Sequence, residues 1–314
     1  MLRPLLLASL AFILPAAAQF HRDDPYPRIH DPSTVVDDAG STLMLCTGHG
    51  VPLLKREADG RWKREGLLFS DYPAWHKKEI PENRGHLWAP DIIRIGSQWF
   101  VYYSVSSFGS NESAIGLATN KTLDPASKDY AWKDEGMIIR SRGSNHYNAI
   151  DPALIMDDGR LWMSFGSFWE GTQLIELDPK TGLRKNAGQQ PIRLATHQEI
   201  EAPFIHKHGD DYYLFVNWGK CCKGVDSTYE IRIGRSKQIT GPYLDKEGVD
   251  LKDGGGAPFL ATEGKFIGPG HASIYKEKGR EMLVHHYYDK DRNGRSDLRM
   301  LPLEWKDGWP LIAR

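Results

Sequence analysis

Residues 151–165 read Asp-Pro-Ala-Leu-Ile-Met-Asp-Asp-Gly-Arg-Leu-Trp-Met-Ser-Phe. An acidic residue and a proline open this stretch, an apolar run follows, and Gly159 marks a turn before a second apolar run. Short apolar runs separated by a glycine turn are typical of paired β-strands. The same frame occurs five times along the chain. The copies begin Asp31-Pro-Ser-Thr-Val, Trp88-Ala-Pro-Asp-Ile, Asp151-Pro-Ala-Leu-Ile, Glu201-Ala-Pro-Phe-Ile and His271-Ala-Ser-Ile-Tyr, and their turn glycines are Gly40, Gly96, Gly159, Gly209 and Gly279.

The spacing of these copies predicts the fold. Their starting positions lie 57, 63, 50 and 70 residues apart, a mean of 60. Four strands of about 5 to 6 residues, with their connections, account for a unit of this length. Five such units arranged radially make an all-β fold, the five-bladed β-propeller. We predict one such domain over residues 19–314, with a β-sandwich of accidental internal similarity as the alternative.

The first 18 residues differ in composition from the rest. A positive charge at Arg3 precedes an apolar centre, and small residues lead to Ala18. This pattern is typical of a secretory signal peptide, so we predict cleavage near Ala18 and a secreted protein, extracellular or periplasmic. A membrane anchor is the alternative, but Pro15 interrupts the apolar run, which is shorter than the ~20 residues that span a bilayer. We find no later segment that could span a membrane.

Charge and cysteine content exclude two further classes of protein. Lys and Arg number 40 against 41 Asp and Glu, a net charge of -1, which lacks the broad positive field of a nonspecific nucleic-acid binder. Three cysteines are too few for a disulfide scaffold. We expect Cys46 in the core, and Cys221 with Cys222 either as a vicinal disulfide or as buried thiols.

The first residues of the five copies suggest a chemistry. The innermost strand of each propeller blade begins beside the central channel, so Asp31, Trp88, Asp151, Glu201 and His271 are expected to converge there. Three carboxylates in one cavity are costly to desolvate without a function. They suit acetal hydrolysis, in which one carboxylic acid protonates the leaving oxygen and one carboxylate activates water or attacks. Any one of them alone would more often be a turn or strand-start residue.

These features occur together in a known family. The chain resembles the glycoside hydrolases of family 43, and within that family the endo-acting arabinanases that cut α-1,5-linked L-arabinan. The resemblance covers nearly all of the expected mature chain. It is carried by His30-Asp31-Pro32, Trp88-Ala-Pro-Asp91, Tyr103-Ser-Val-Ser-Ser-Phe-Gly109, Asn148-Ala-Ile-Asp151-Pro152, Phe165-Gly-Ser-Phe-Trp169, Glu201-Ala-Pro-Phe204, Cys221-Cys222, Ser227-Thr-Tyr229, Gly268-Pro-Gly-His271 and Trp305-Lys-Asp-Gly-Trp-Pro310.

The resemblance implies an inverting mechanism at the mouth of the channel. In it Asp31 is the general base, Glu201 the general acid, and Asp151 a residue that tunes and orients. Glu201 would have to stay protonated although an isolated Glu titrates near ~4.3, so its pocket is expected to raise its pKa. Asp31 would have to stay ionised.

The same resemblance implies residues that bind sugar. Aromatic side chains would contact sugar faces, Asn148 and Ser167 would hydrogen-bond hydroxyls, and Gly109 would let the backbone approach closely. The expected substrate-binding residues are Trp88, Phe108, Gly109, Asn148, Ala149, Ile150, Ser167, Phe168 and Trp169.

One metal ion is implied as well. The family places a histidine in the motif of His271 beside a central ion, commonly calcium, whose other ligands are largely waters. A neutral histidine hydrogen-bonded in the channel is the alternative, because calcium prefers oxygen ligands. No organic cofactor is expected.

Several functions remain open at this level. An exo-acting α-L-arabinofuranosidase or a β-xylosidase could use the same scaffold, because the carboxylates do not set the shape of the cleft. A propeller that binds sugar without cleaving it is an alternative from another class, although it would not need the three acids. We expect a monomer whose partner is a polysaccharide, with no nucleic-acid or membrane partner.

Overall fold

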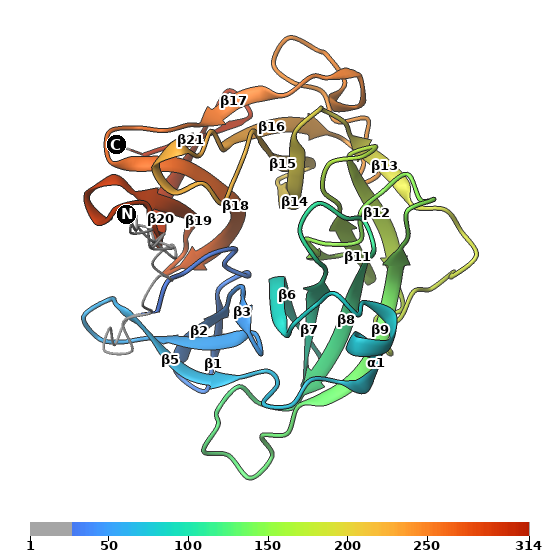
Figure 1. Ribbon diagram of the computed structural model, residues 1–314. Helices are drawn as coiled ribbons and strands as arrows, with labels where there is room; N and C mark the ends of the chain where they lie inside the picture. The colour runs from blue at the N-terminus through green and yellow to red at the C-terminus, as the bar shows by residue number, and fades with distance from the viewer. Residues whose placement is uncertain (1–26, 314) are drawn as a thin grey trace, which may run out of the picture.

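Strand follows strand along residues 27–313, the part of the chain that the computed structural model describes, and consecutive strands form antiparallel sheets. Five such sheets surround a central axis (Figure 1), so the predicted five-bladed β-propeller is confirmed and the sandwich is excluded. The predicted signal peptide, residues 1–18, lies outside the described residues.

Each blade consists of strands that are consecutive in sequence, with one exception. The exception is β3 (Gly48–His49), which leaves blade 1 and pairs with β6 of blade 2. Blade 1 contains β1 (Val36–Asp38), β2 (Ser41–Leu45), β4 (Pro52–Arg56) and β5 (Trp62–Leu67); blade 2 contains β6 (His86–Ile95), β7 (Gln98–Val105), β8 (Ser113–Asn120) and β9 (Lys133–Ser141); blade 3 contains β10 (Ala153–Asp157), β11 (Arg160–Phe165), β12 (Thr172–Leu177) and β13 (Ile192–Ala195); blade 4 contains β14 (Ile200–His208), β15 (Asp211–Trp218), β16 (Glu230–Ser236) and β17 (Ala257–Leu260); blade 5 contains β18 (Phe266–Glu277), β19 (Arg280–Asp289), β20 (Arg295–Lys306) and β21 (Trp309–Ile312).

Helices are few and short in the described part of the chain. They are α1 (Ala74–Glu79) and the 3-10 turns η1 (Gly224–Asp226), η2 (Leu251–Asp253) and η3 (Lys290–Arg292). Helix α1 places Nε2 of the buried His76 3.0 Å from the Tyr103 hydroxyl of blade 2. None of the described helices has the length and apolar character needed to cross a membrane.

The hairpin of residues 153–165 shows why the repeated frame folds in this way. Asp157 pairs with Arg160, so only two residues form the loop between β10 and β11. Asp158 and Gly159 have φ of 45° and 74°, the two positive angles of the type I′ turn that matches the twist of antiparallel strands. Glycine adopts this angle without steric cost, which is why a turn glycine marks each copy.

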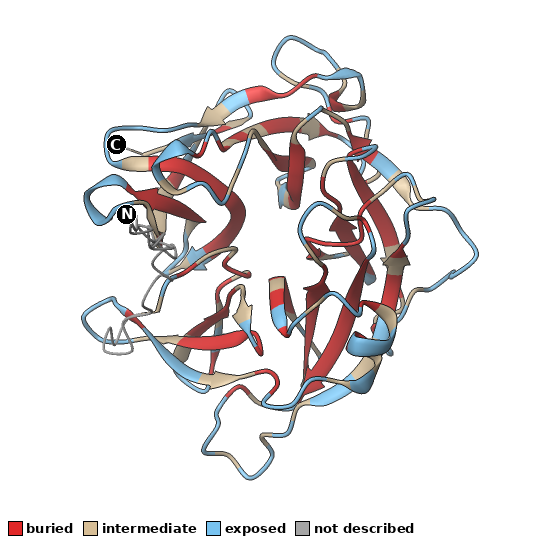
Figure 2. Cartoon of the chain, in the orientation of Figure 1, coloured by how far each residue is buried: buried red, intermediate tan, exposed pale blue. Residues whose placement is uncertain are grey.

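The core lies between neighbouring blades. Figure 2 shows buried residues along the strands and exposed residues in the loops at the rim. One cluster joins blades 2 and 3 through fully buried side chains such as Tyr102, Leu161 and Phe165. Each such apolar side chain contributes roughly 1.5 to 3 kcal/mol by leaving water. The propeller is therefore a ring of apolar interfaces.

Side chains, not a shared sheet, join blade 5 to blade 1 in the described residues. No sheet there combines strands from both ends of the chain. Instead Tyr275 donates to Asp37 at 2.9 Å, and the His30 ring lies 2.7 Å from the Tyr288 hydroxyl. The closure brings His30, from the start of the described chain, beside strand β19.

One position in or just before each innermost strand has the same backbone conformation in all five blades. Its residue has a positive φ in all five blades and donates its N–H to a side chain of a neighbouring strand or loop. These residues are Asp31, Ala89, Asp151, Ala202 and His271. In blades 2 and 4 the equivalent residue is thus one later than the sequence frame predicts, because the structural repeat follows the prolines at 32, 90, 152 and 203, which line the channel together. Trp88 and Glu201 precede the equivalent position.

Candidate active site

Three carboxylates meet where the innermost strands begin. Asp31 precedes β1, Asp151 precedes β10, and Glu201 is the second residue of β14. Asp151 Oδ2 accepts a hydrogen bond from the Ala202 N–H at 3.2 Å, which ties it to the residue after Glu201. The structure therefore brings the three predicted acids to one end of the channel.

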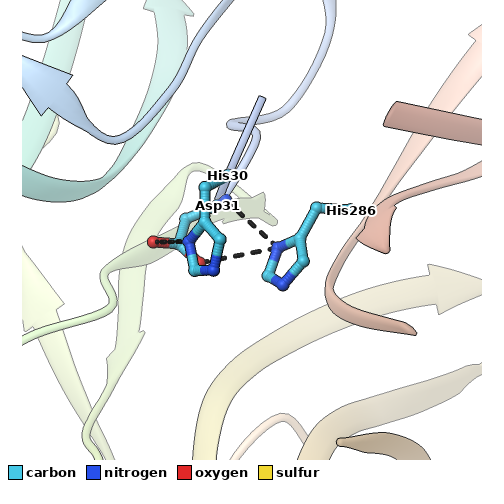
Figure 3. A group of neighbouring side chains, drawn as sticks. All are labelled: His30, Asp31 and His286. Atoms are coloured by element: carbon cyan, nitrogen blue, oxygen red, sulfur yellow. Dashed lines mark hydrogen bonds and ion pairs between the residues drawn. The ribbon is translucent and has the colours of Figure 1, made fainter. Parts of the chain in front are cut away.

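Asp31 is surrounded by histidines. Nδ1 of His30 lies 2.8 Å from Asp31 Oδ2, which also accepts the Thr47 hydroxyl at 2.6 Å. Nδ1 atoms of His271 and His286 each lie 3.6 Å from Oδ1. Figure 3 shows the contacts of Asp31 with His30 and His286. Asp31 is thus held by the Thr47 hydroxyl and by His30, with two further imidazoles beside Oδ1.

The hydrogen bonds assign different charges to these imidazoles. Nδ1 of His286 accepts the Asp31 N–H at 3.1 Å, so that nitrogen carries no proton and the ring is neutral. Burial and the charge on His30 lower the pKa of His286, which agrees. His30, between Asp31 and the Tyr288 hydroxyl, is the cation.

The pKa values of Asp31 and His30 move apart. Burial alone would raise the pKa of Asp31, but the charge and hydrogen bond of His30 outweigh it and hold that pKa well below its usual range. Burial alone would lower the pKa of His30, and Asp31 raises it well above its usual range. Asp31 is therefore ionised at any pH at which the protein would work.

Glu201 has the opposite environment. Burial raises its pKa, and the charge of Asp31 adds to this rise, while the hydroxyls of Tyr229 and Ser167 oppose it. Tyr229 donates to Oε1, and Ser167 donates to Oε2 at 2.7 Å. The side chain has no basic residue against it among these contacts, so the proton on Glu201 is retained to higher pH than in water.

Asp151 is the third carboxyl group. Burial raises its pKa well above the usual range, and repulsion from Glu201 and then from Asp31 raises it further. The Ala202 N–H opposes this rise. Two neighbouring carboxyls that repel each other retain a proton between them.

The predicted aromatic binding residues are partly or largely exposed. The rings of Trp88 and Phe108 are in contact with centroids 4.8 Å apart, and Phe108 is 80% exposed. Trp169 is 44% exposed and Phe168 partly so. Gly109 has a φ of 74°, and a side chain there would meet no atom within 4 Å. Two aromatic rings in contact, one of them largely exposed, offer an apolar surface to a ligand.

The other residues predicted to bind substrate are buried. Ser167 contacts Glu201, as described above, and Asn148, three residues before Asp151, is buried with its Oδ1 atom unpaired. Ala149 is fully buried in the core between blades 2 and 3, where its N–H binds Ser141 Oγ. Ile150 is also buried. The side chains of Ala149 and Ile150 therefore do not reach the surface.

His271 lies in the channel beside Asp31. Its N–H binds Asn217 Oδ1 at 2.9 Å, and burial lowers the pKa of its ring, so the ring is neutral and offers a lone pair. Three imidazoles and one carboxylate surround this point, whereas calcium prefers six to eight oxygen ligands. The donor set fits calcium only where water supplies most of the oxygens.

The structure confirms the prediction for Cys46 but neither alternative predicted for Cys221 and Cys222, a disulfide or buried thiols. Cys46 is buried in a core cluster, as predicted. Cys221 and Cys222 are free thiols with sulfur atoms 2.6 Å apart, and Cys222 Sγ lies 3.8 Å from His30 Nε2. The pair is therefore part of the wall of the site, and neither thiol is fully buried.

Sequence reasoning assigned no role to several residues of the site. Thr47, Asn217 and His286 lie on or beside strands that read as core, and each binds the backbone or side chain of a channel residue. The only signal for His286 was a polar residue within the apolar run of residues 282–288. Tyr229 was included in a matched motif without a role.

Comparison with known proteins places this geometry in a family. The family model described as "Glycosyl hydrolases family 43" matches residues 27–310. The chain belongs to glycosyl hydrolases family 43. It is 43% identical over 300 residues to the extracellular exo-α-(1→5)-L-arabinofuranosidase ArbA of Cellvibrio japonicus, covering 90% of this chain and 86% of that one. It is 40% identical over 289 residues to the extracellular endo-α-(1→5)-L-arabinanase 1 of Bacillus subtilis, covering 90% and 87%.

Solved structures of arabinanases have the same fold. The α-L-arabinanase of Cellvibrio cellulosa in complex with arabinohexaose superposes with a TM-score of 0.86 at 40% identity, covering 92% of this chain and 96% of that one. An exo-1,5-α-L-arabinanase from a bovine ruminal metagenomic library superposes with a TM-score of 0.88 at 41% identity, covering 94% and 100%. This family 43 protein is accordingly a glycoside hydrolase.

Proposed function

We propose that this family 43 hydrolase cuts internal α-1,5-L-arabinofuranosidic bonds of arabinan. The observation that carries the proposal is that the pKa values of two carboxyls at the mouth of the channel are shifted in opposite directions. Asp31 is paired with a cationic His30, which lowers its pKa, and Glu201 is buried, which raises its pKa. A base and an acid distinguished in this way are what glycoside hydrolysis needs. The names of the Bacillus and Cellvibrio relatives support arabinan as the substrate.

In the proposed reaction one water molecule is consumed for each glycosidic bond that is broken. Asp31 takes a proton from the water as the water oxygen bonds to the anomeric carbon. The bond from that carbon to the leaving oxygen breaks, and Glu201 gives its proton to the leaving oxygen. The anomeric configuration inverts, because water attacks the face opposite the leaving group. Asp151 and Glu201 repel each other, so the pair retains a proton between them, and Asp151 holds the backbone after Glu201.

The exposed aromatic residues supply the proposed binding surface. Trp88 and Phe108 contact each other and Trp169 is exposed, so sugar rings can stack there while Asn148 and Ser167 bind hydroxyls. Exo action is the second candidate function, because two of the similar proteins are named as exo-acting. A β-xylosidase has no such support from the names.

Calcium, export and a monomeric state complete the proposal. His271 would hold a largely water-coordinated calcium ion, which would add positive charge beside Asp31. Elemental analysis of the purified protein, with a His271→Ala variant beside it, tests this.

Relatives named as extracellular support secretion, and N-terminal sequencing of the secreted protein would reveal a start near residue 19. Light scattering tests the monomer.

Product analysis tests the main proposal. We expect a mixture of short arabino-oligosaccharides at early times from linear arabinan, and a rate lower by about 10²- to 10⁴-fold in Asp31→Ala and in Glu201→Ala. Asp59→Ala, at an exposed carboxylate, is the matched control. Arabinose alone at the earliest times would establish the exo candidate. Cleavage of xylan without arabinan, or tight binding without products, would refute the proposal.

A further inference from the structure

A second group of metal-ligating side chains lies far from the carboxylates. His206 and His208 are alternate residues at the end of β14, and Glu281 is the second residue of β19. One ligand atom from each of the three lies within 4.8 Å of the other two. Glu201 is near the start of β14, so about 20 Å of extended strand separates this group from the candidate acid.

The distances within the group are close to those between the ligands of one small cation. Nε2 of His206 lies 3.1 Å from Oε1 of Glu281, and Nδ1 of His208 lies 3.3 Å from Oε2. Ligands at 2.0 to 2.2 Å from a tetrahedral Zn²⁺ lie roughly 3.3 to 3.6 Å from one another. Two imidazoles and a carboxylate are also the donors that zinc and neighbouring divalent transition metals prefer.

The accessibility of the group suits a metal ion. The side chains are 17%, 40% and 20% exposed in the order His206, His208 and Glu281. A metal ion could reach them and keep a water ligand at a free coordination position.

An indole ring orients these ligands. Trp305 of β20 donates its Nε1–H to Glu281 Oε2 at 2.7 Å and stacks on His208 with ring centroids 3.7 Å apart and planes at 12°. Metal ligands are commonly held by such neighbouring hydrogen bonds, whose loss weakens metal binding about 10- to 100-fold. One side chain therefore fixes both a carboxylate and an imidazole.

We propose that His206, His208 and Glu281 bind one Zn²⁺ or a similar divalent transition metal ion and link blade 4 to blade 5. The two histidines come from the innermost strand of blade 4 and the glutamate from blade 5, so a bound ion connects two sheets that share no strand. The ion binds the folded ring and not the unfolded chain, and it therefore stabilises the propeller.

Zinc titration tests the site. The full-length protein, without a histidine tag and after treatment with a chelator, is titrated with ZnCl₂ in a calorimeter, and the midpoint of thermal unfolding is measured with and without zinc. His206→Gln/His208→Gln should bind one equivalent fewer than the wild type and lose the zinc-dependent rise in melting temperature. Trp305→Phe keeps the stacking but lacks the N–H donor, so it should bind that equivalent about 10- to 100-fold more weakly.

Two further measurements separate this site from the channel. His30, Asp31 and His286 are another group that could take zinc, so His286→Gln is titrated as well and should keep the equivalent that the double variant loses. Co²⁺ in place of Zn²⁺ should give the visible absorption of a four-coordinate ion in the wild type and in His286→Gln. Equal zinc stoichiometry and equal melting temperatures in the wild type and the His206/His208 double variant would overturn the proposal.

Discussion

The hydroxyl of Tyr229 donates a hydrogen bond to Oε1 of Glu201 while Ser167 donates to Oε2, so both oxygens of the buried carboxyl are occupied. Donors to a carboxylate stabilise its ionised form, whereas burial favours the protonated form. The pKa of Glu201 is raised in spite of two donors, which means that burial prevails. Each donor therefore limits how far that pKa rises.

Replacing Tyr229 by Phe should move the alkaline limb of the activity profile to higher pH. The variant lacks one donor that lowers the pKa of Glu201, so the acid keeps its proton further into the alkaline range. The dependence of kcat/KM on pH measures the limb. Ser167→Ala should move it in the same direction, and a shift to lower pH in either variant would contradict the assignment of Glu201 as the acid.

Replacing His30 by Gln should move the acid limb to higher pH. The charge and hydrogen bond of His30 keep the pKa of Asp31 low, and without them burial raises it. The base is then lost as the pH falls through the raised pKa. His146→Gln, at an exposed histidine paired with Glu170, is the control. An unchanged acid limb would show that His30 is not what keeps Asp31 ionised.

The sequence predicts the ring of blades because local features dictate it. A two-residue turn such as Asp158-Gly159 fixes the register of a hairpin, and five copies of it fix the number of blades. The carboxylates are also predictable, because a charged residue before an apolar inner strand is unusual. The one-residue offset of Trp88 and Glu201 from the equivalent position depends on which residue takes the positive φ, and only the prolines indicate it.

The environment of the carboxylates is less predictable. His30 and Tyr288 are 258 positions apart and come together only because blade 5 closes on blade 1. His286 lies on a strand that reads as core, and its fully buried ring binds the Asp31 N–H. Such contacts follow from ring closure and not from any local pattern.

Removing the exposed ring of Phe108 should weaken substrate binding with little effect on the fold. Phe108 is 80% exposed and contacts Trp88, so Phe108→Ala should change the free energy of unfolding by no more than about 0.5 kcal/mol. A lost stacking contact of about 0.5 to 1.5 kcal/mol corresponds to a KM higher by roughly 2- to 13-fold on arabinan. A lower kcat at unchanged KM would argue against a binding role. Tyr72→Ala, at another exposed aromatic residue, is the control.

Asp91 should be needed for stability. Its Oδ1 accepts the Thr34 N–H at 2.9 Å and its Oδ2 accepts the Leu154 N–H at 2.7 Å, so one side chain of blade 2 joins the inner strands of blades 1 and 3. Asp91→Ala leaves two buried donors unpaired, at about 1 to 3 kcal/mol each. We expect the free energy of unfolding in urea to fall by about 2 to 6 kcal/mol, against less than about 0.5 in the exposed control Asp59→Ala. A fall of less than 1 kcal/mol would show that water reaches these donors.

Alkylation of Cys222 should inactivate the reduced protein. The hydrogen bond from Cys221, and then His30, lowers the pKa of Cys222 to about 5 although burial opposes this, so its sulfur is a thiolate at neutral pH and reacts readily. The added group would lie beside His30, whose ring the sulfur already approaches within 3.8 Å, and would disturb the ion pair with Asp31. The rate of inactivation by iodoacetamide, followed by mass spectrometry of the labelled peptide, measures this. Cys222→Ser should resist inactivation, and an arabino-oligosaccharide should slow it in the wild type. Equal rates in the variant and the wild type would place the reactive thiol elsewhere.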